Sequence, residues 1–418
     1  MDTITHGIVG ALAGKALFGG QDIPAGVSGS GVARALSSPT ARVAIFGCTI
    51  GSMFPDIDIF AGPLGHNPLA IMEWHRNITH SVIMLPFWAF LLALLSIPLA
   101  RLLKWQSPPL ATLFAVYALG IATHIFLDLV TSFGTMVWSP LQYSRHSWDW
   151  VFILDLTLTS IALAPQLAAW CYREPGQFKL RVIGVWAVLT LGAFGAYLFA
   201  GASGYGFPMY VVGIASAIFA AVVFLPAMQG AGFQWTRASW CRAGLAALCA
   251  YIGLTAVAHH KAFADVQQFA ASQNLHVESV AAMPLPPTLT HWVGLVRTPE
   301  GVWRETFHEP GGALESTEFY AEAGPSDLIE QARKLHDVQV FLWFARYPVW
   351  HMRQRDGQQT VIDISDVRFF RESASDTAGV PQPPRGISDA RPRSGGFAFQ
   401  IVFDADGRII SHGFREDR

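Results

Sequence analysis

The chain has 418 residues, of which 52% are hydrophobic and only 14% are charged. This composition excludes an ordinary soluble protein, in which about a quarter of the residues are charged. The net charge of −2 gives no indication of nucleic-acid binding, and none is expected. The four cysteines lie in apolar stretches without C-x-x-C spacing, so they predict small buried side chains and neither a zinc knuckle nor a disulfide framework.

Two short apolar segments come first, at residues 7–18 and 43–54. Both are shorter than the roughly 20 apolar residues that cross a bilayer core, so we expect a helical pair that is buried against other helices. Six longer apolar windows predict membrane spans at residues 81–100, 110–130, 151–171, 182–200, 209–228 and 238–258. The expected fold is an α-helical integral membrane bundle of about six spans plus the short N-terminal helical pair.

Lysine and arginine residues in short loops predict the orientation of these spans. They fall in alternate loops and can all be cytoplasmic: Lys15, Arg34, Arg42, Arg101, Lys104, Arg173, Lys179, Arg181, Arg237 and Arg242. We therefore expect a multi-pass membrane protein with its C-terminal domain outside the cytoplasm.

After about residue 259 the pattern becomes that of a soluble domain without cysteines. The segments 291–307, 350–364 and 397–414 each predict two strands joined by a Gly-containing turn. Ser326 is expected to open a short helix, and residues 372–396 to form a flexible surface loop. The expected domains are a metal-site helical membrane domain (1–160), additional transmembrane helices (161–260) and an extracytoplasmic α+β antiparallel-sheet domain (261–418).

Histidines and aspartates recur at the ends of the predicted helices, where ionisable side chains are costly and indicate a function. His124 and Asp128, four residues apart, lie on one helical face. Each group also has a structural interpretation as a cap, a turn, a buried pair or an interfacial residue. The predicted topology nevertheless places all groups at one membrane face, and imidazole with carboxylate suits zinc, iron or manganese. The predicted metal ligands are His6, Asp56, His75, His80, His124 and Asp128.

Two arginines add phosphate-binding capacity to this face. Arg76 and Arg145 are expected to bind a phosphate through paired guanidinium donors, and Asp58 is assigned to catalysis with them. His146 and Asp149 accompany Arg145 in the segment 139–150. His146 is interpreted as a spare polar residue as readily as a ligand, and no role is assigned to Asp149.

The segment "HRNITHS" stands directly before an apolar run. A helix beginning near Thr79 would hold His80 rigidly in its first turn, while His75 and Arg76 approach from the preceding segment. We therefore expect His80→Ala to remove the metal. Arg76→Ala is expected to leave the metal in place and to weaken turnover by about 2–4 kcal/mol.

Five motifs, in order, resemble those of bacterial YdjM-type proteins, a family of membrane-bound, metal-dependent hydrolases by prediction. They are "MDTITHGIVGALAG", "FPDIDIF", "HRNITHS", "THIFLDLVTSFGT" and "SPLQYSRHSWDWVFILD". The resemblance covers roughly residues 1–160. Two later motifs, "FARYPV" at 344–349 and "DVRFF" at 366–370, resemble longer family members.

The order of the ligands is also similar to that in zinc-dependent phospholipase C and the related single-strand nucleases. This similarity implies that Asp128 bridges metals. The chain lacks the further histidines and the His-x-x-x-Glu helix that follow in those enzymes. The expectation is therefore one or two divalent ions, zinc in the first place, with manganese or iron as alternatives.

The resulting expectation is an enzyme that uses metal-activated water to hydrolyse an ester. Its substrate would be a phosphoester or other ester of a lipid or lipid-linked molecule at the outer face of the inner membrane, with membrane lipids as partners. Two alternatives stay open. One is a transporter or lipid-handling protein with a His/Asp ion or proton pathway. The other is a non-catalytic envelope assembly protein whose outer domain binds a protein partner.

Overall fold

The computed structural model describes residues 1–18, 39–60, 68–202, 208–228, 230–311, 313–355, 359–370 and 398–414. It divides the chain into two compact units. The first, called the helical unit below, consists of Met1–Asp58 and Arg76–Thr255, and the second, the sheet unit, of Ile59–His75 and Ala256–Arg418. Arg34, most of "GASGYGFP" and the predicted loop 372–396 lie outside the described residues.

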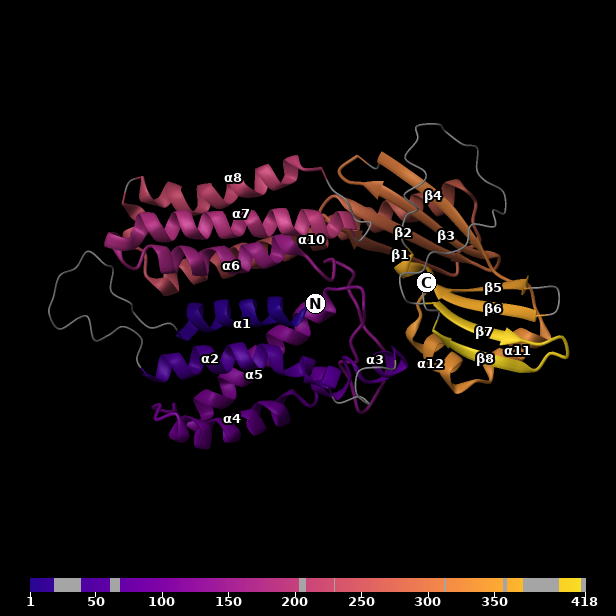
Figure 1. Ribbon diagram of the computed structural model, residues 1–418, viewed down its shortest axis with the longest axis horizontal. Coiled ribbons are helices and arrows are strands. Elements are labelled where there is room, and N and C mark those ends of the chain that lie inside the picture. The colour runs from indigo at the N-terminus through magenta and orange to yellow at the C-terminus, as the bar shows by residue number, and fades with distance from the viewer. Residues whose placement is uncertain are drawn as a thin grey trace. The chain divides into compact units, whose positions relative to one another are not determined.

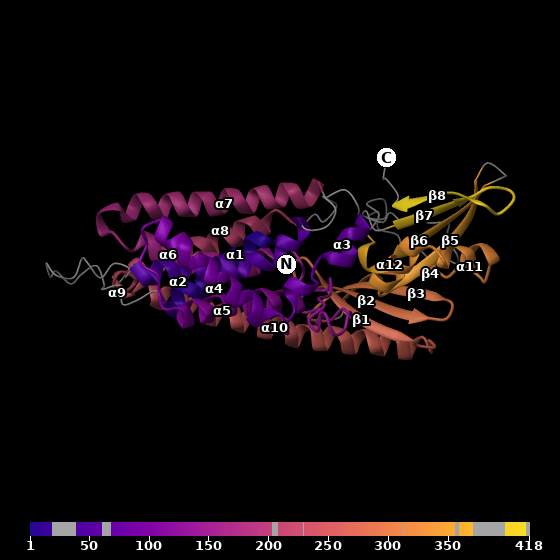
Figure 2. The ribbon, with the colours of Figure 1, turned by 90° about the horizontal axis from the view of Figure 1, so that it is seen from below.

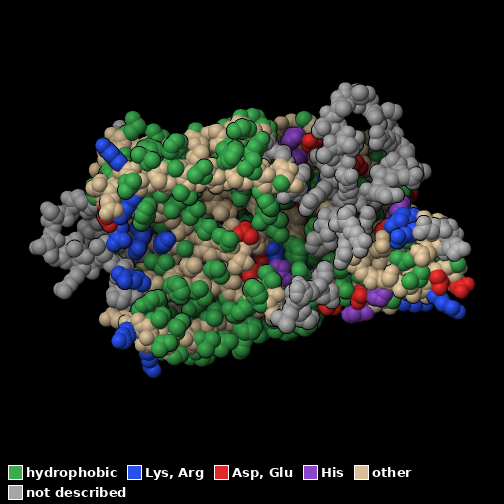
Figure 3. All heavy atoms as spheres, viewed as in Figure 1, with side chains coloured by type: hydrophobic (Ala, Val, Ile, Leu, Met, Phe, Trp, Pro, Cys, Tyr) green, Lys and Arg blue, Asp and Glu red, His purple; other side chains and the backbone are tan. Residues whose placement is uncertain are grey.

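The helical unit is a bundle in which the longer helices run side by side (Figures 1 and 2). Its elements are α1 (Thr3–Phe18), α2 (Pro39–Met53), most of η2 (Phe54–Phe60), η3 (Ile78–His80), α4 (Leu85–Leu102), α5 (Leu110–Leu129), α6 (Leu156–Cys171), η4 (Pro175–Gln177), α7 (Phe178–Ala202), α8 (Tyr210–Phe224), η5 (Leu225–Ala227), α9 (Ala231–Gln234) and the first part of α10 (Arg237–Ser272). Hydrophobic side chains cover much of the side seen in Figure 3.

Six described helical segments are long and apolar enough to cross a membrane: Ala41–Phe60, Leu85–Leu102, Leu110–Leu129, Pro175–Phe199, Tyr210–Ala227 and Arg237–Ser272. The predicted fold class is confirmed, but two assignments change. The segment 43–54 is not short, because η2 extends α2 into a 20-residue apolar segment. The predicted span 151–171 contracts to the 16 residues of α6, because Asp155 caps this helix and accepts hydrogen bonds from the N–H groups of Thr157 and Leu158.

The prediction that all four cysteines are buried is wrong for one of them. Cys48, Cys171 and Cys241 are buried, whereas Cys249 is exposed on α10. In a membrane bundle an outward apolar side chain can face lipid, which is as apolar as the protein interior, so hydrophobicity does not imply burial.

Glycines allow α2 to approach α1 and α5 closely. A Cβ atom on Gly10 of α1 would lie 2.5 Å from the Ser52 Cβ, and one on Gly120 of α5 would lie 2.5 Å from the Cys48 carbonyl oxygen. Small residues at such contacts are typical of helix packing in membranes, where close van der Waals contact drives association. These contacts draw the last turn of α2 towards both neighbours.

The sheet unit contains two antiparallel four-stranded sheets with strand orders β1-β2-β3-β4 and β5-β6-β7-β8. The strands are β1 (Ser279–Leu285), β2 (His291–Thr298), β3 (Gly301–His308), β4 (Ala313–Ala321), β5 (Pro348–Arg355), β6 (Gln359–Asp366), β7 (Ala398–Phe403) and β8 (Ile409–Phe414). The predicted hairpins are confirmed as β2–β3, β5–β6 and β7–β8. The short helices are α3 (Pro68–Trp74), α11 (Asp327–Arg333), α12 (His336–Phe344) and η6 (Val367–Phe369). Ser326 caps α11, as predicted.

Strand β2 of the first sheet is buried on both faces, and its side chains alternate between them. Trp292 packs with Val266 on the last part of α10, which runs along this sheet in Figure 2. Leu295 faces the other way and packs with Tyr347 and Val349 of the second sheet and its approach. This packing extends α10 as far as Ser272, beyond the predicted end of its span at residue 258.

The motifs "FARYPV" and "DVRFF" fold against each other. Arg368 Nη2 lies 2.7 Å from Asp366 Oδ2, with both side chains almost fully buried. The Arg346 N–H donates to the same oxygen at 3.0 Å, and Arg368 donates to the Phe344 carbonyl oxygen at 3.1 Å. The two motifs therefore join β5, β6 and α12 through one buried ion pair, which indicates a structural role within the sheet unit.

Candidate metal site

The structure brings four of the predicted ligands together. Asp56, His80, His124 and Asp128 each contribute one ligand atom, and these atoms lie within 4.8 Å of one another. The four residues are buried, and His80, His124 and Asp128 have no exposed surface. His6 of α1 adjoins them: its Nε2 lies 3.2 Å from Asp128 Oδ1, and its ring stacks on His124 with centroids 3.6 Å apart. The helix ends of α1, α2 and α5 and the turn before α4 thus converge.

His80 does not stand in the first turn of an α-helix, so the predicted helix start near Thr79 is wrong. His80 ends the short 3-10 turn Ile78–His80, and α4 starts at Leu85. The delay has two causes: a proline favours the first turn of α4, and Ser81 Oγ accepts hydrogen bonds from the N–H groups of the two residues that follow Val82.

Contacts at Nδ1 orient the rings of His80 and His124 so that their Nε2 atoms face each other. His124 Nδ1 lies 2.7 Å from the Ser52 carbonyl oxygen, which can only accept, so Nδ1 carries the proton. His80 Nδ1 lies 3.2 Å from Asp58 Oδ2, and the same reasoning applies. The two Nε2 atoms are 2.9 Å apart. Two nitrogens at this distance need a proton or a metal ion between them.

The remaining distances fit a metal ion. His80 Nε2 lies 3.5 Å from Asp56 Oδ1 and 3.2 Å from Asp128 Oδ2. His124 Nε2 lies 3.4 Å from each of these oxygens. Metal–ligand bonds of about 2.0–2.2 Å in a tetrahedral site separate neighbouring ligand atoms by roughly 3.3–3.6 Å. Within the described residues, Asp128 Oδ2 has no hydrogen-bond partner. The donor set therefore suits a divalent cation.

The charges around the cluster lead to the same conclusion. Three carboxylates, of Asp56, Asp58 and Asp128, are buried here. Arg76 Nη2 lies 2.9 Å from Asp128 Oδ1, and the Met1 nitrogen contacts the same oxygen. Negative charges still outnumber these positive ones, and buried charges require compensation. A divalent cation, or a proton on one of the histidines, would supply it.

Asp58 contacts both the turn before α4 and the ring of His80. Its Oδ2 accepts the Arg76 N–H at 3.0 Å and the Thr79 hydroxyl at 2.9 Å, beside His80 Nδ1. The backbone of Arg76 has a positive φ of 63°. In this conformation its N–H group contacts Asp58 while its guanidinium contacts Asp128. A carboxylate on the distal nitrogen of a metal-binding histidine fixes the ring's orientation.

Arg145 and Arg76 both lie near the Phe133 ring but make different contacts. Its Nη1 donates to the Gly134 carbonyl oxygen at 3.0 Å. Its guanidinium carbon lies 5.5 Å from the centroid of the Phe133 ring, and that of Arg76 lies 4.9 Å from the same centroid. The assignment of both arginines to a phosphate stays a prediction.

The roles of three other predicted residues stay open. His146 Nε2 lies 3.0 Å from Ser144 Oγ, and Asp149 is buried with a φ of 57°. His75 belongs to the sheet unit, where its N–H donates to the Ile71 carbonyl oxygen. Its assignment as a metal ligand stays a prediction.

Sequence reasoning missed three partners of the cluster. Thr3 Oγ1 donates to Asp56 Oδ2 at 2.5 Å, Thr79 bridges Asp58 and His80, and the Ser52 carbonyl oxygen orients His124. Two of these partners could have been found from the sequence, because Thr3 and Thr79 lie inside the quoted motifs.

Comparisons with known proteins identify the family of the helical part. No curated protein and no solved structure matches the chain. The family described as YdjM inner membrane protein matches residues 1–205, a range that contains all five motifs and the whole four-ligand cluster. Together with the six apolar helical segments, this match makes the chain a multi-pass membrane protein. The predicted resemblance is confirmed, because residues 1–205 match the family described as YdjM inner membrane protein.

Proposed function

We propose that this protein is a membrane-bound hydrolase that requires a divalent metal. The observation that carries the proposal is the buried set of Asp56, His80, His124 and Asp128, whose ligand atoms lie within 4.8 Å of one another. Zinc is the metal that this donor set favours, with manganese or iron as alternatives. A bound ion of this kind would lower the pKa of a water molecule and polarise an ester or phosphoryl oxygen.

The chain's own residues would keep the site in one geometry. Ser52 and Asp58 hold the protons of His124 and His80 on Nδ1, so the two Nε2 atoms are available as ligands. Arg76 holds Asp128 through Oδ1 and leaves Oδ2 for the metal. Rigid support of this kind is what a metal centre requires for affinity and for orientation of a substrate.

The proposed substrate is an ester or phosphoester of a lipid or lipid-linked molecule. Apolar side chains next to the ligands in sequence are exposed, including Ile4 (72%), Ile57 (53%) and Ile78 (41%). Such a surface around a polar centre favours a substrate that lies in the membrane. The proposed location is the outer face of the inner membrane, which rests on the positions of lysine and arginine in the loops.

A second candidate is a metal site that stabilises the bundle and performs no catalysis. The complete burial of His80, His124 and Asp128 favours it, because structural metal sites are closed whereas catalytic sites keep an open position. Metal would then contribute to folding without supporting turnover.

One experiment tests the proposal and separates the two candidates. The full-length protein, purified in detergent, is analysed for metal content by mass spectrometry and for hydrolysis of bis(p-nitrophenyl) phosphate and p-nitrophenyl acetate. We expect about one or two metal ions per chain, and loss of both metal and hydrolysis in His124→Ala. His146→Ala is the matched control and should retain both. Metal without hydrolysis of these or lipid phosphoesters would favour the structural site, and a metal-free wild type after metal supplementation would refute both candidates.

A further inference from the structure

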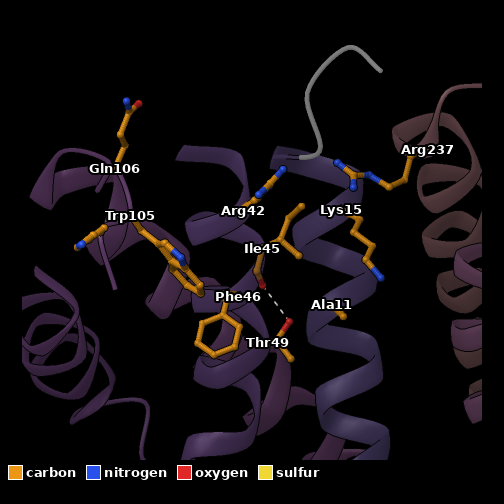
Figure 4. A pocket seen from close by; sticks show the side chains of 10 residues that line it. Ala11, Lys15, Arg42, Ile45, Phe46, Thr49, Trp105, Gln106 and Arg237 are labelled. Carbon is orange, nitrogen blue, oxygen red and sulfur yellow. Dashed lines mark hydrogen bonds between the residues drawn. The ribbon is translucent and has the colours of Figure 1, made fainter. Parts of the chain in front are cut away.

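A pocket of about 610 Å³ lies in the helical unit, at the end of the bundle away from the metal site (Figure 4). It opens among the last turns of α1, the first turns of α2, the connection from α4 to α5 and the start of α10. Its lining includes Lys15, Arg42, Lys104 and Arg237, and no Asp or Glu among the described residues. We propose that this basic pocket binds the phosphate headgroup of an anionic phospholipid.

The pocket is distinct from the metal site. His6 and Lys15 both belong to α1, and a rise of about 1.5 Å per residue separates them by roughly 14 Å along the helix axis. Lysine and arginine side chains gather at this end of the helical unit in Figure 3, whereas hydrophobic side chains cover its flank. The change from green to blue marks the boundary between the lipid core and the headgroups, because the apolar spans end here.

The charge of the pocket calls for an anion. Four like charges that line one volume repel one another, and an anion in their midst relieves this repulsion. Arg42 and Lys104 are exposed and can reach a ligand from the rim, while Lys15 is half-buried and donates to Gln166 Oε1 at 2.7 Å. Arginine and lysine together recognise phosphate through both directed hydrogen bonds and point charge.

The aromatic residues of the pocket favour a lipid over a free phosphate ion. Trp105 packs edge-on against Phe46, with ring centroids 5.9 Å apart, and the two side chains are 45% and 47% exposed. Tryptophan is enriched at headgroup depth, where its ring contacts the glycerol and upper acyl region. Basic pockets between transmembrane helices at this depth bind anionic headgroups. The cations would therefore hold the phosphate while the aromatic wall contacts the lipid's apolar part.

The test is a titration of the full-length protein in zwitterionic detergent, followed by native mass spectrometry. The probes are dihexanoyl phosphatidylglycerol, dihexanoyl phosphatidylcholine, glycerol phosphate and inorganic phosphate. The test variant is Arg42→Gln with Lys104→Gln. The matched control is Arg173→Gln with Lys179→Gln, which removes two exposed cations from the same unit outside the pocket. Retained metal content, or thermal stability if no metal is bound, shows that each variant is folded.

We expect the wild type and the control to prefer phosphatidylglycerol over phosphatidylcholine, and the pocket variant to lose affinity for phosphatidylglycerol by about tenfold or more. Equal binding of the two lipids by the wild type would overturn the proposal. An equal loss in the control variant would also overturn it, since it would show general attraction to surface charge. If glycerol phosphate or inorganic phosphate binds as tightly as phosphatidylglycerol, the pocket is a soluble-phosphate site and the lipid assignment fails.

Discussion

Arg76 and Asp128 form a fully buried ion pair in which Nη2 lies 2.9 Å from Oδ1. Arg76 Nη1 also donates to Thr131 Oγ1 at 3.0 Å, so the guanidinium is held on both sides. The arginine thus lies against a metal-binding carboxylate, 52 positions away in the chain. This contact gives Arg76 a role that its motif did not indicate.

Arg76→Ala is expected to lower metal affinity by about 10–100-fold, because outer partners of metal ligands contribute factors of this size. The sequence-based expectation was retention of the metal with weaker turnover. Titration of the metal-free protein with zinc separates the two outcomes, and Arg145→Ala, which removes the other guanidinium near the Phe133 ring, serves as the control. Unchanged zinc affinity in Arg76→Ala would show that the ion pair does not position Asp128.

Gly120→Ala is expected to destabilise the bundle by about 1–3 kcal/mol, because its Cβ would lie 2.5 Å from the Cys48 carbonyl oxygen. Backbone atoms cannot move aside as a flexible side chain would. Gly184→Ala on α7 is the control, since nothing lies within 4 Å of its added Cβ. Thermal unfolding in detergent should show a lower midpoint for Gly120→Ala alone; equal midpoints would argue against the close approach of α2 and α5.

Asp366→Asn is expected to destabilise the sheet unit by roughly 3–5 kcal/mol, because it leaves the buried Arg368 without its charge partner. Asp406→Asn is the matched control: its partner Arg408 lies 3.9 Å away and both side chains are highly exposed, so the effect should be below about 1 kcal/mol. Hydrogen exchange of the β5–β6 amides in the full-length protein measures both. Similar exchange rates in the two variants would refute the structural role of "DVRFF".

Glu305 predicts a pH dependence in the sheet unit. Burial raises the pKa of this carboxyl group from 4.5 to about 7. The folded state therefore retains a proton that the unfolded chain loses, and this group lowers the stability as the pH rises from about 4.5 to 7. Glu305→Gln should match the wild type near pH 4 and exceed its stability by about 1–3 kcal/mol at pH 8. Hydrogen exchange of β3 at both pH values measures this difference. Glu330→Gln is the control, because the Glu330 side chain is exposed on α11. A difference that stays constant across pH would contradict the raised pKa.

The orientation of the protein is testable with reporters. Alkaline phosphatase fused after residue 418 should be active and green fluorescent protein at the same position dark, because the loops rich in lysine and arginine are expected in the cytoplasm. Fusions after Lys104 should show the reverse. A fluorescent C-terminal fusion would place the sheet unit in the cytoplasm and move the metal site to that face.

The sequence by itself determined which elements exist. Apolar length alone predicted five of the six long apolar segments, because a bilayer core requires about 20 apolar residues in helical form. Alternation and Gly-containing turns likewise predicted the hairpins β2–β3, β5–β6 and β7–β8, since both signals are local. The ends of the helices were harder to predict. Asp155 shortens α6 because it caps its first turn, and Pro86 and Ser81 move the start of α4 to Leu85. The position of a helix end depends on which of its backbone N–H and C=O groups have hydrogen-bond partners.

Only the tertiary structure decided what each polar residue does. Asp56 and Asp58 are the same residue type two positions apart, yet the turn η2 directs Asp56 towards Nε2 of His80 and Asp58 towards its Nδ1. The carbonyl oxygen of Ser52, which orients His124, carries no signal in a side-chain pattern. Ligand geometry depends on how closely α1, α2 and α5 approach, and that distance follows from contacts at Gly10 and Gly120 that pair segments far apart in the chain. Local sequence patterns carry no information about such pairings. The candidate ligands could therefore be predicted from the sequence, but their arrangement in space could not.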